Sequence, residues 1–344
     1  MTHPYENLDH RQFWAPAVGQ REAIQIGDLW CPRFAIRAED RIVTFGSCFA
    51  QHIGRALVAR GFGWTDFEQA PPLLTKDEAA AYNFGVFSAR TGNIYTARML
   101  RQWVGWAFGD APVPGEVWQR EGRFFDPFRP TIEPDGFASP AEVSSARELT
   151  LERFREAITE TSLFILTLGL TESWRNLGFP CEYAICPGVL AGKYDPALHA
   201  FHNAPYSEIL ADLTATLARI RRANPALRVL LTVSPVPLTA SASGQHVLIA
   251  TTQSKSVLRA VASALEGDGV DYFPAYEIIS APPFGGRFFA ENRRSVTAEG
   301  VAHVMAQFFA ALEGAVRAPL QAAPEAADDL VCEEQILAAF APQA

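Results

Sequence analysis

A glycine, a serine and a cysteine occupy the point where an apolar run gives way to a helical pattern. Residues 42–45 have the composition of a buried strand, Gly46, Ser47 and Cys48 follow, and residues 49–61 carry apolar side chains at helical spacing. Backbone N–H groups at the start of a helix attract negative charge and can stabilise an oxyanion. The Ser47 hydroxyl is therefore either a nucleophile served by a nearby base or only the cap of the helix.

Four short apolar runs predict the strands that must position Ser47. They are residues 41–45, 163–168, 228–233 and 270–273. Their near-continuous apolarity is typical of parallel strands that helices cover on both faces. The helical patterns between and after them are residues 47–61, 207–225, 254–267 and 297–314. This alternation predicts a doubly wound α/β domain with a parallel sheet.

Hydroxyl groups recur at the predicted strand ends, where open parallel sheets bind their ligands. The loop "GLTESW" follows residues 163–168 and contributes Thr171 and Ser173. The loop "SPVPLTAS" follows residues 228–233 and contributes Ser234 and Thr239. We expect these loops to meet the Ser47 turn at one edge of the sheet.

Residues 71–150 interrupt the alternation with an insertion that is rich in tryptophan and phenylalanine. The segment "NIYTARMLRQWVGWAFG" predicts a helix, and "EVWQREGRFFDPFRPTI" predicts a hairpin. The insertion either packs on the main sheet or forms an aromatic wall suited to sugar or acyl groups. We expect one domain over residues 1–320, followed over 321–344 by a linker and a short helix, "VCEEQILAAFA".

Composition narrows the class of protein. Hydrophobic residues make up 49% and charged residues 19%, which predicts a folded core, and the net charge of -9 argues against a general nucleic-acid binder. The five cysteines include no CxxC pair, so we expect no disulfide framework, metal or cofactor. The N-terminus lacks a signal-peptide apolar region, and no apolar run is long enough to span a membrane, which indicates a soluble cytoplasmic protein. A thiolate at a helix start has a lowered pKa, but we interpret Cys48 as structural.

The motif "TFGSCFAQHIG" resembles the signature of the GSCFA family, which is grouped with the SGNH/GDSL-type hydrolases of flavodoxin-like α/β fold. The similarity extends over "FILTLGLTESW", "TVSPVPLTAS", "TQSKSVLRAV" and "DYFPAYEII". The resemblance implies that Ser47 is the nucleophile. It also implies an oxyanion donor at Gly92, beside Asn93, and a third block at 169–172. There Gly169 is retained, Thr171 replaces the usual asparagine, and Glu172 replaces the acid.

The general base expected from the resemblance is missing. SGNH-type enzymes carry Asp-x-x-His near the C-terminal end of the domain, and Asn292 and Ser295 stand at those positions here. We favour His246 as a replacement, because its loop follows a strand end, and His202 as the second choice. An imidazole nitrogen is then expected within roughly 3.5 Å of the Ser47 hydroxyl. The remaining candidates are His52 and His303.

Arginines lie around the positions where the base is expected. Arg287, Arg293 and Arg294 surround the segment, and guanidinium groups hold carboxylates or phosphates well. They are either a site for an anionic group or solvated charges at a helix entry. Two functions therefore remain open. One is an SGNH-type serine esterase or O-acyltransferase acting on a small-molecule or carbohydrate substrate, with a possible acyl donor, by analogy in a surface-polysaccharide context. The other is a non-catalytic carbohydrate- or anion-binding module.

Overall fold

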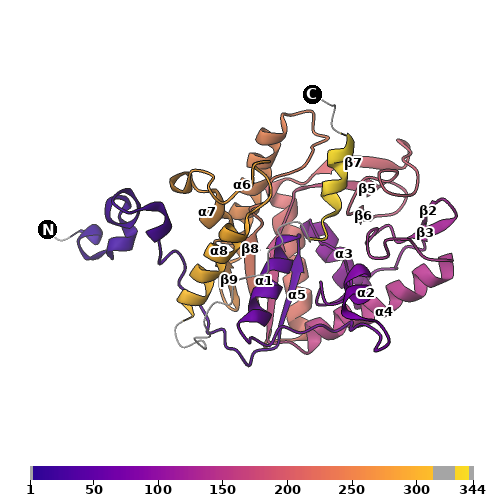
Figure 1. Cartoon of the computed structure of the whole chain (residues 1–344), viewed down its shortest axis with the longest axis horizontal. Coiled ribbons are helices and arrows are strands. Elements are labelled where there is room, and N and C mark those ends of the chain that lie inside the picture. Colours follow the sequence, from indigo (N-terminus) through magenta and orange to yellow (C-terminus); the bar gives the residue numbers. More distant parts are fainter. Residues whose placement is uncertain (1–2, 313–329, 341–344) are drawn as a thin grey trace.

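The computed structural model describes residues 3–312 and 330–340. Its centre is a parallel sheet of four strands, which are the four predicted apolar runs (Figure 1). The strand order is β1-β4-β8-β9. The strands are β1 (Ile42–Gly46), β4 (Leu163–Leu168), β8 (Arg228–Val233) and β9 (Val270–Phe273). Trp64 forms a parallel bridge with Ile42. The chain thus returns along the free edge of β1 after the first helix, in the manner of Rossmann- and flavodoxin-like folds.

Helices cover both faces of this sheet. One face packs against α1 (Phe49–Ala59), α7 (Ala275–Ser280) and α8 (Ala298–Ala311). The other packs against α4 (Pro140–Thr159), α5 (Tyr206–Ala223) and α6 (Val247–Leu265). Successive strand residues alternate between the two cores, because side chains along a strand point to opposite faces. This is the three-layer arrangement predicted from the sequence.

Three helix boundaries test the sequence predictions. Gly61, the predicted end of the first helix, has a positive φ of 73°, and Thr297 caps the start of α8 with its side chain. Helix α6 begins at Val247, seven residues earlier than the predicted start at residue 254. The apolar run 247–250 extends the helix toward its N-terminus, and His246 caps it.

The aromatic insertion packs on the main domain. It contains α2 (Lys76–Ala81), the predicted helix as α3 (Ala97–Ala107), and the predicted hairpin as β2 (Trp118–Arg120) and β3 (Arg123–Phe125). Its tryptophans, together with Phe125 and Phe128, join the core that also contains residues of α4 and α5, instead of forming an open wall. The fully buried members are Trp103 and Phe128. Helix α4 then crosses from the insertion to β4.

A second sheet of three antiparallel strands follows β4. Its order is β6-β5-β7, with β5 (Glu172–Asn176), β6 (Glu182–Tyr183) and β7 (His199–Asn203). The segment "GLTESW", expected as a loop, therefore supplies the beginning of β5. Its pairing with residues about thirty positions later, Glu172 opposite Asn203, is a tertiary contact that the local pattern did not indicate.

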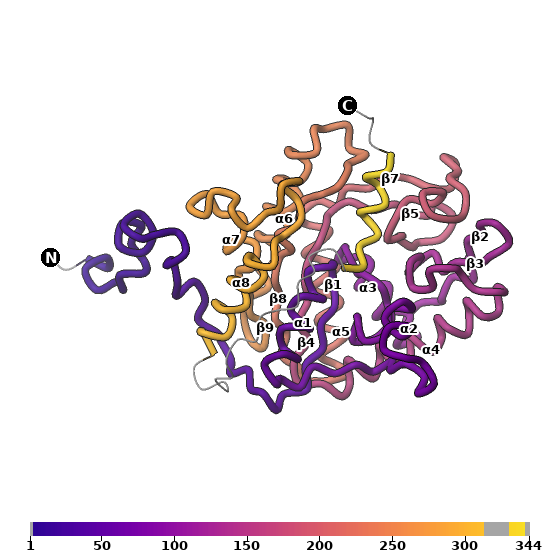
Figure 2. The backbone as a smooth tube through the Cα atoms, in the orientation of Figure 1, coloured from indigo at the N-terminus to yellow at the C-terminus, as the bar shows by residue number. Residues whose placement is uncertain are grey.

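The two ends of the chain lie in different places. The N-terminal segment forms short helical turns that extend away from the sheet (Figure 2). The turns are Pro4–Asn7, His10–Gln12, Ala15–Gly19 and Ala23–Gln25. The 3-10 helix η6 (Glu333–Phe340) corresponds to the predicted terminal helix, whereas residues 321–329 of the predicted linker lie outside the described residues. Among the helices of residues 3–312 and 330–340, none has the length and apolarity to cross a bilayer.

Candidate functional site

Ser47 lies at a tight turn between β1 and α1. Gly46 has a φ of 119°, and a Cβ atom there would lie 2.1 Å from the Thr167 carbonyl oxygen, so only glycine fits. The Ser47 side chain is 3% exposed, and its Oγ has no hydrogen-bond partner within the described part of the chain. Its N–H donates to the Thr167 carbonyl at 2.9 Å, so this predicted oxyanion donor is engaged in the sheet.

The loop 91–94 runs beside this turn, because the Ile94 N–H donates to the Gly46 carbonyl at 2.8 Å. Gly92 has a φ of 66°, a left-handed conformation that favours glycine. The backbone N–H groups of Gly92 and Asn93 make no hydrogen bond to any described residue. A Cβ atom on Gly92 would lie 3.2 Å from the Arg129 Cβ and 3.4 Å from the Glu333 Oε1, so the α-carbon of Gly92 faces these residues.

The third block lies against Ser47 from the other side. A Cβ atom on Gly169 would lie 2.9 Å from the Ser47 Cβ, so glycine permits this approach. The Thr171 hydroxyl donates to the Asn203 side chain at 2.7 Å, and its N–H donates to the Ser254 hydroxyl. Thr171 is thus engaged within the protein.

Glu172 accepts a hydrogen bond from the Ser241 hydroxyl at 2.8 Å, and burial raises the pKa of Glu172. It lines a cavity of 290 Å³ beside the C-terminal end of the chain. The carboxyl group is therefore bound by a loop residue and available to a ligand in that cavity.

Neither favoured histidine bonds to Ser47. His246 is exposed and caps α6 by accepting from the Leu248 N–H, and the His202 Nε2 is 2.9 Å from the Glu208 carboxylate. His52 is buried against Phe49, and burial lowers the pKa of His52 to about 4.

The segment around Asn292 and Ser295, where the family's base is expected, bonds within itself. His303 stacks on Phe288. The Asn292 side chain donates to the Ser295 hydroxyl at 3.0 Å, so the residues at the family's Asp and His positions bond to each other. The expected imidazole–serine hydrogen bond is absent from the described residues, and the prediction of that contact was wrong.

Lys255 is a basic residue at this edge that sequence reasoning missed. Its side chain is fully buried on α6, and its Nζ donates to the Gly169 carbonyl at 2.7 Å. Burial lowers the pKa of Lys255 to about 8. The available signal was a lysine on the apolar face of the predicted helix, in line with Leu258 and Ala262.

The C-terminal segment, residues 330–340, lies over this edge (Figure 2). The Val331 carbonyl accepts hydrogen bonds from the Gln51 side chain at 2.8 Å and from the Asn93 side chain at 2.7 Å. The buried Glu333 carboxylate accepts from Asn93 at 2.6 Å and from the Tyr95 hydroxyl at 2.7 Å. The segment thus occupies donors that surround the Ser47 turn.

A second carboxylate of this segment lies nearby. Glu334 is buried and accepts from Arg294 at 3.4 Å. Burial, with the neighbouring Cys332, raises the pKa of Glu334 to about 7, whereas Arg294 and Lys255 oppose that rise. Arg294 also keeps a buried Nε without a partner among the described residues. Arg293 is exposed and forms no ion pair within residues 3–312 and 330–340.

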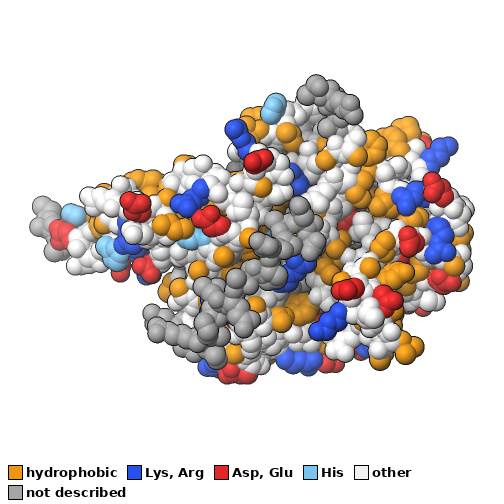
Figure 3. Space-filling model, viewed as in Figure 1, with side chains coloured by type: hydrophobic (Ala, Val, Ile, Leu, Met, Phe, Trp, Pro, Cys, Tyr) orange, Lys and Arg blue, Asp and Glu red, His pale blue; other side chains and the backbone are white. Residues whose placement is uncertain are grey.

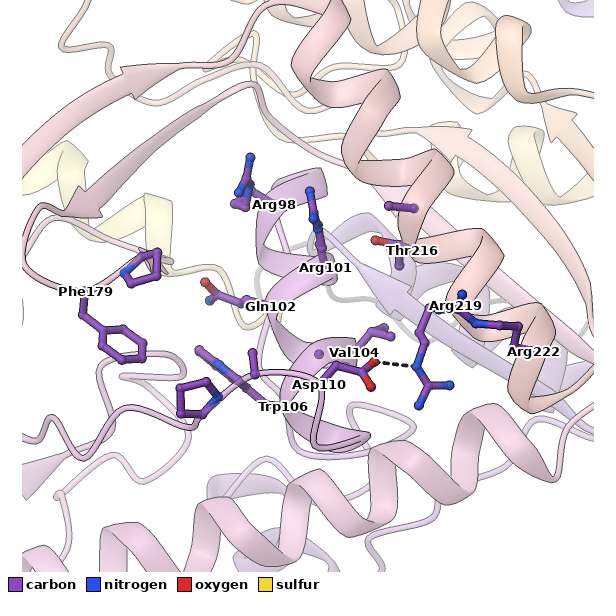
Figure 4. A pocket seen from close by; sticks show the side chains of 15 residues that line it. Arg98, Arg101, Gln102, Val104, Trp106, Asp110, Phe179, Thr216, Arg219 and Arg222 are labelled. Atoms are coloured by element: carbon purple, nitrogen blue, oxygen red, sulfur yellow. Dashed lines mark hydrogen bonds and ion pairs between the residues drawn. The ribbon is translucent and has the colours of Figure 1, made fainter.

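An open cavity beside the insertion lies elsewhere. It encloses 530 Å³ between α3 and α5 and is lined by Arg98, Arg101 and Arg219 (Figure 4). These arginines are paired with Asp212 or Asp110. On the face seen in Figure 3, basic and acidic side chains are likewise interspersed. None of the site residues described above lines this cavity.

A parallel sheet with helices on both faces, and a buried serine at the first strand–helix turn, define a Rossmann- or flavodoxin-like α/β protein. The family model described as GSCFA family matches residues 41–308, from β1 to α8, and the chain belongs to the GSCFA family. The match includes Ser47, Lys255 and Arg294 and excludes the C-terminal segment. No curated protein and no solved structure matches the chain.

Proposed function

We propose that this protein is an SGNH-type serine esterase or O-acyltransferase whose acyl-enzyme forms on Ser47. The observation that carries the proposal is the buried Ser47 hydroxyl, which has no hydrogen-bond partner among the described residues, at the turn that the loop 91–94 contacts through the Ile94 N–H. A buried hydroxyl normally finds a partner, and an unpartnered one calls for an explanation such as a catalytic role or a bound water. A capping serine would instead bond its own helix, and the Ser47 Oγ makes no such bond within the described residues.

Lys255 is the base that the geometry favours. Its pKa of about 8 leaves a neutral fraction at working pH, and its acceptor, the Gly169 carbonyl, belongs to the residue packed on Ser47. To act as the base, the Lys255 amine must turn from the Gly169 carbonyl toward the Ser47 hydroxyl. Hydrogen bonds between catalytic groups often form only when substrate binds. His246 and His202 remain predictions as alternative bases, and each would have to leave its present hydrogen bond.

The proposed reaction has two halves. Neutral Lys255 takes the Ser47 proton while Oγ attacks the ester carbonyl carbon, and the carbonyl oxygen becomes an oxyanion held by Gly92 and Asn93. Collapse breaks the bond to the alcohol, which receives the proton from Lys255. Water or a sugar hydroxyl then attacks the acyl-serine, its proton passes to Lys255, and Ser47 recovers a proton as it leaves. Carbohydrate as the acceptor rests on the family resemblance alone.

Reaction with a fluorophosphonate tests this proposal. The probe should label the wild type at Ser47 and leave Ser47→Ala unlabelled, with peptide mass spectrometry locating the adduct. The Ala variant should also lose hydrolysis of p-nitrophenyl acetate while its Tm stays within a few degrees, because the Ser47 Oγ contributes no hydrogen bond to the fold. Equal turnover by both proteins would end the nucleophile assignment.

A specific observation favours a second function, a non-catalytic anion-binding module. Two carboxylates already occupy the site, Glu333 and Glu334, and polar donors hold both. This function predicts no fluorophosphonate labelling, even at high probe concentration, together with measurable binding of carboxylates.

A further inference from the structure

Four side chains from separate parts of the chain converge on the C-terminal segment. Asn93, Tyr95 and Thr131 donate to the Glu333 carboxylate and form what we call the carboxylate cradle, whereas Gln51 donates to the Val331 carbonyl. Gln51 comes from α1, Asn93 and Tyr95 precede α3, and Thr131 follows the hairpin. One oxygen of Glu333 accepts from Asn93 and Tyr95, and the other accepts from Thr131 at 2.9 Å.

The cradle is built for a carboxylate group. Glu333 is 0% exposed and forms no salt bridge with any residue in 3–312 or 330–340, so neutral donors hold it in the absence of a basic partner. Three donors on two oxygens suit the acceptor capacity of a carboxylate. Asn93 and Tyr95 are themselves buried, so without an acceptor their donors would be left unsatisfied.

The cradle belongs to the family domain, and its occupant does not. All three cradle residues lie within the matched residues 41–308, whereas Glu333 lies beyond them. Asn93 of the cradle precedes Ile94, whose N–H donates to the Gly46 carbonyl next to Ser47. The domain thus contains a carboxylate-binding subsite at its candidate active edge that the chain's own C-terminal segment fills.

We propose that the carboxylate cradle is the subsite for a carboxylate group of the protein's ligand, and that Glu333 is an internal stand-in which the ligand displaces. The ligand class is a small carboxylate-bearing molecule, either a free organic diacid or an acidic sugar. Its identification as the substrate rests on the proposed function of Ser47; carboxylate binding by the cradle does not.

Displacement can be followed without any activity, because Cys332 is buried in the docked segment and Cys31 is exposed. The full-length protein is treated with iodoacetamide, and alkylation of each cysteine is measured by peptide mass spectrometry. Glutarate and D-glucuronate are compared with glutaramide and D-glucuronamide at matched ionic strength. At least one acid should accelerate alkylation of Cys332 relative to Cys31 severalfold, and the amides should not.

The two acids separate the ligand sources. Acceleration by glutarate alone indicates a free organic acid, acceleration by glucuronate alone indicates an acidic sugar, and acceleration by both indicates that the carboxylate suffices. If neither acid accelerates alkylation, or if the amides act equally, the proposal is overturned.

Variants separate a ligand subsite from a purely structural contact. Glu333→Gln should undock the segment and tighten glutarate binding about tenfold by calorimetry, because it removes the internal competitor. Tyr95→Phe should also speed Cys332 alkylation but weaken glutarate binding, since it removes a cradle donor. Tyr272→Phe, an equally buried tyrosine bonded to Glu277, is the matched control and should behave as wild type. Unchanged or weaker binding in Glu333→Gln would overturn the proposal.

Ser47→Ala keeps this test distinct from that of the proposed function. It should retain displacement and glutarate binding at wild-type level, because Ser47 contributes no donor to the cradle. If acids displace the C-terminal segment but the wild-type protein never reacts with fluorophosphonate, the cradle proposal is supported and the esterase function is refuted.

Discussion

The cavity between α3 and α5 and the turn at Ser47 are both lined by polar side chains, but their hydrogen bonding differs. In the cavity, Arg98, Arg101 and Arg219 are each paired with an aspartate, so little electrostatic capacity remains for a ligand. At the turn, the Ser47 hydroxyl and the buried Arg294 Nε have no partner within the described residues. Other buried atoms, such as Trp103 Nε1 and Arg129 Nη2, are unpartnered there too, so the position of Ser47 at a strand–helix turn, together with its unpartnered hydroxyl, is what favours it as a candidate site.

Lys255 should show the largest difference between the two regions. Lys255→Gln should lower p-nitrophenyl acetate hydrolysis by a factor on the order of 10³, because it removes the proposed base. Arg101→Gln in the cavity should leave the rate within about twofold, because Arg101 touches no residue of the candidate site.

The pH profile sharpens this prediction. Only the neutral amine accepts a proton, and the pKa of Lys255 is lowered to about 8. The rate should therefore rise as the pH increases toward about 8 and then level off. A profile governed by a group titrating near 6.5 would point to a histidine base and contradict the assignment to Lys255.

Substitution of one glycine in each region should change the free energy of unfolding by a smaller amount. Gly169→Ala places a Cβ 2.9 Å from the Ser47 Cβ and 3.1 Å from the Tyr95 carbonyl, and overpacking of this kind costs about 1–3 kcal/mol. Gly105→Ala in α3 lines the cavity and brings its Cβ no closer than 3.7 Å to Ala111, an ordinary contact. It should stabilise the helix by up to about 1 kcal/mol.

Urea denaturation of both variants measures these changes in the free energy of unfolding. If Gly169→Ala proves as harmless as Gly105→Ala, the Ser47 turn is looser than its packing indicates, and the third block has no steric reason to retain glycine.

The sequence predicted those strands, turns and helix ends that depend on residues close together in the chain. The four parallel strands, Gly61 at the end of α1 and the hairpin in the insertion all follow from apolar runs, turn residues and spacing. The residues that complete the site could not be found this way. Glu333 meets Asn93 across 240 positions and Lys255 meets Gly169 across 86, so only the folded chain brings them together.

The proposed base shows the same limit. Asn292 and Ser295 stand at the positions of the pattern Asp-x-x-His, and the sequence predicts a histidine elsewhere as the replacement. The structure puts a lysine from α6 at the third block instead. The sequence alone shows that a lysine lies on the apolar face of a helix. It does not show that this lysine donates to the Gly169 carbonyl, because that contact depends on how α6 packs on the sheet.

Arg294 and Arg293 give the smallest and most selective comparison. The Arg294 guanidinium is mostly buried and bonds to Glu334 at 3.4 Å, whereas Arg293 is exposed without an ion pair among the described residues. Arg294→Gln should weaken docking of the C-terminal segment by about 1 kcal/mol, a modest value because the distance is long. Cys332 alkylation should then rise about fivefold, and Arg293→Gln should leave it unchanged.

Added salt should speed alkylation in the wild type and in Arg293→Gln, which retain the ion pair, more than in Arg294→Gln. Equal effects of the two substitutions would mean that general positive charge, rather than the contact with Glu334, holds the segment over the site.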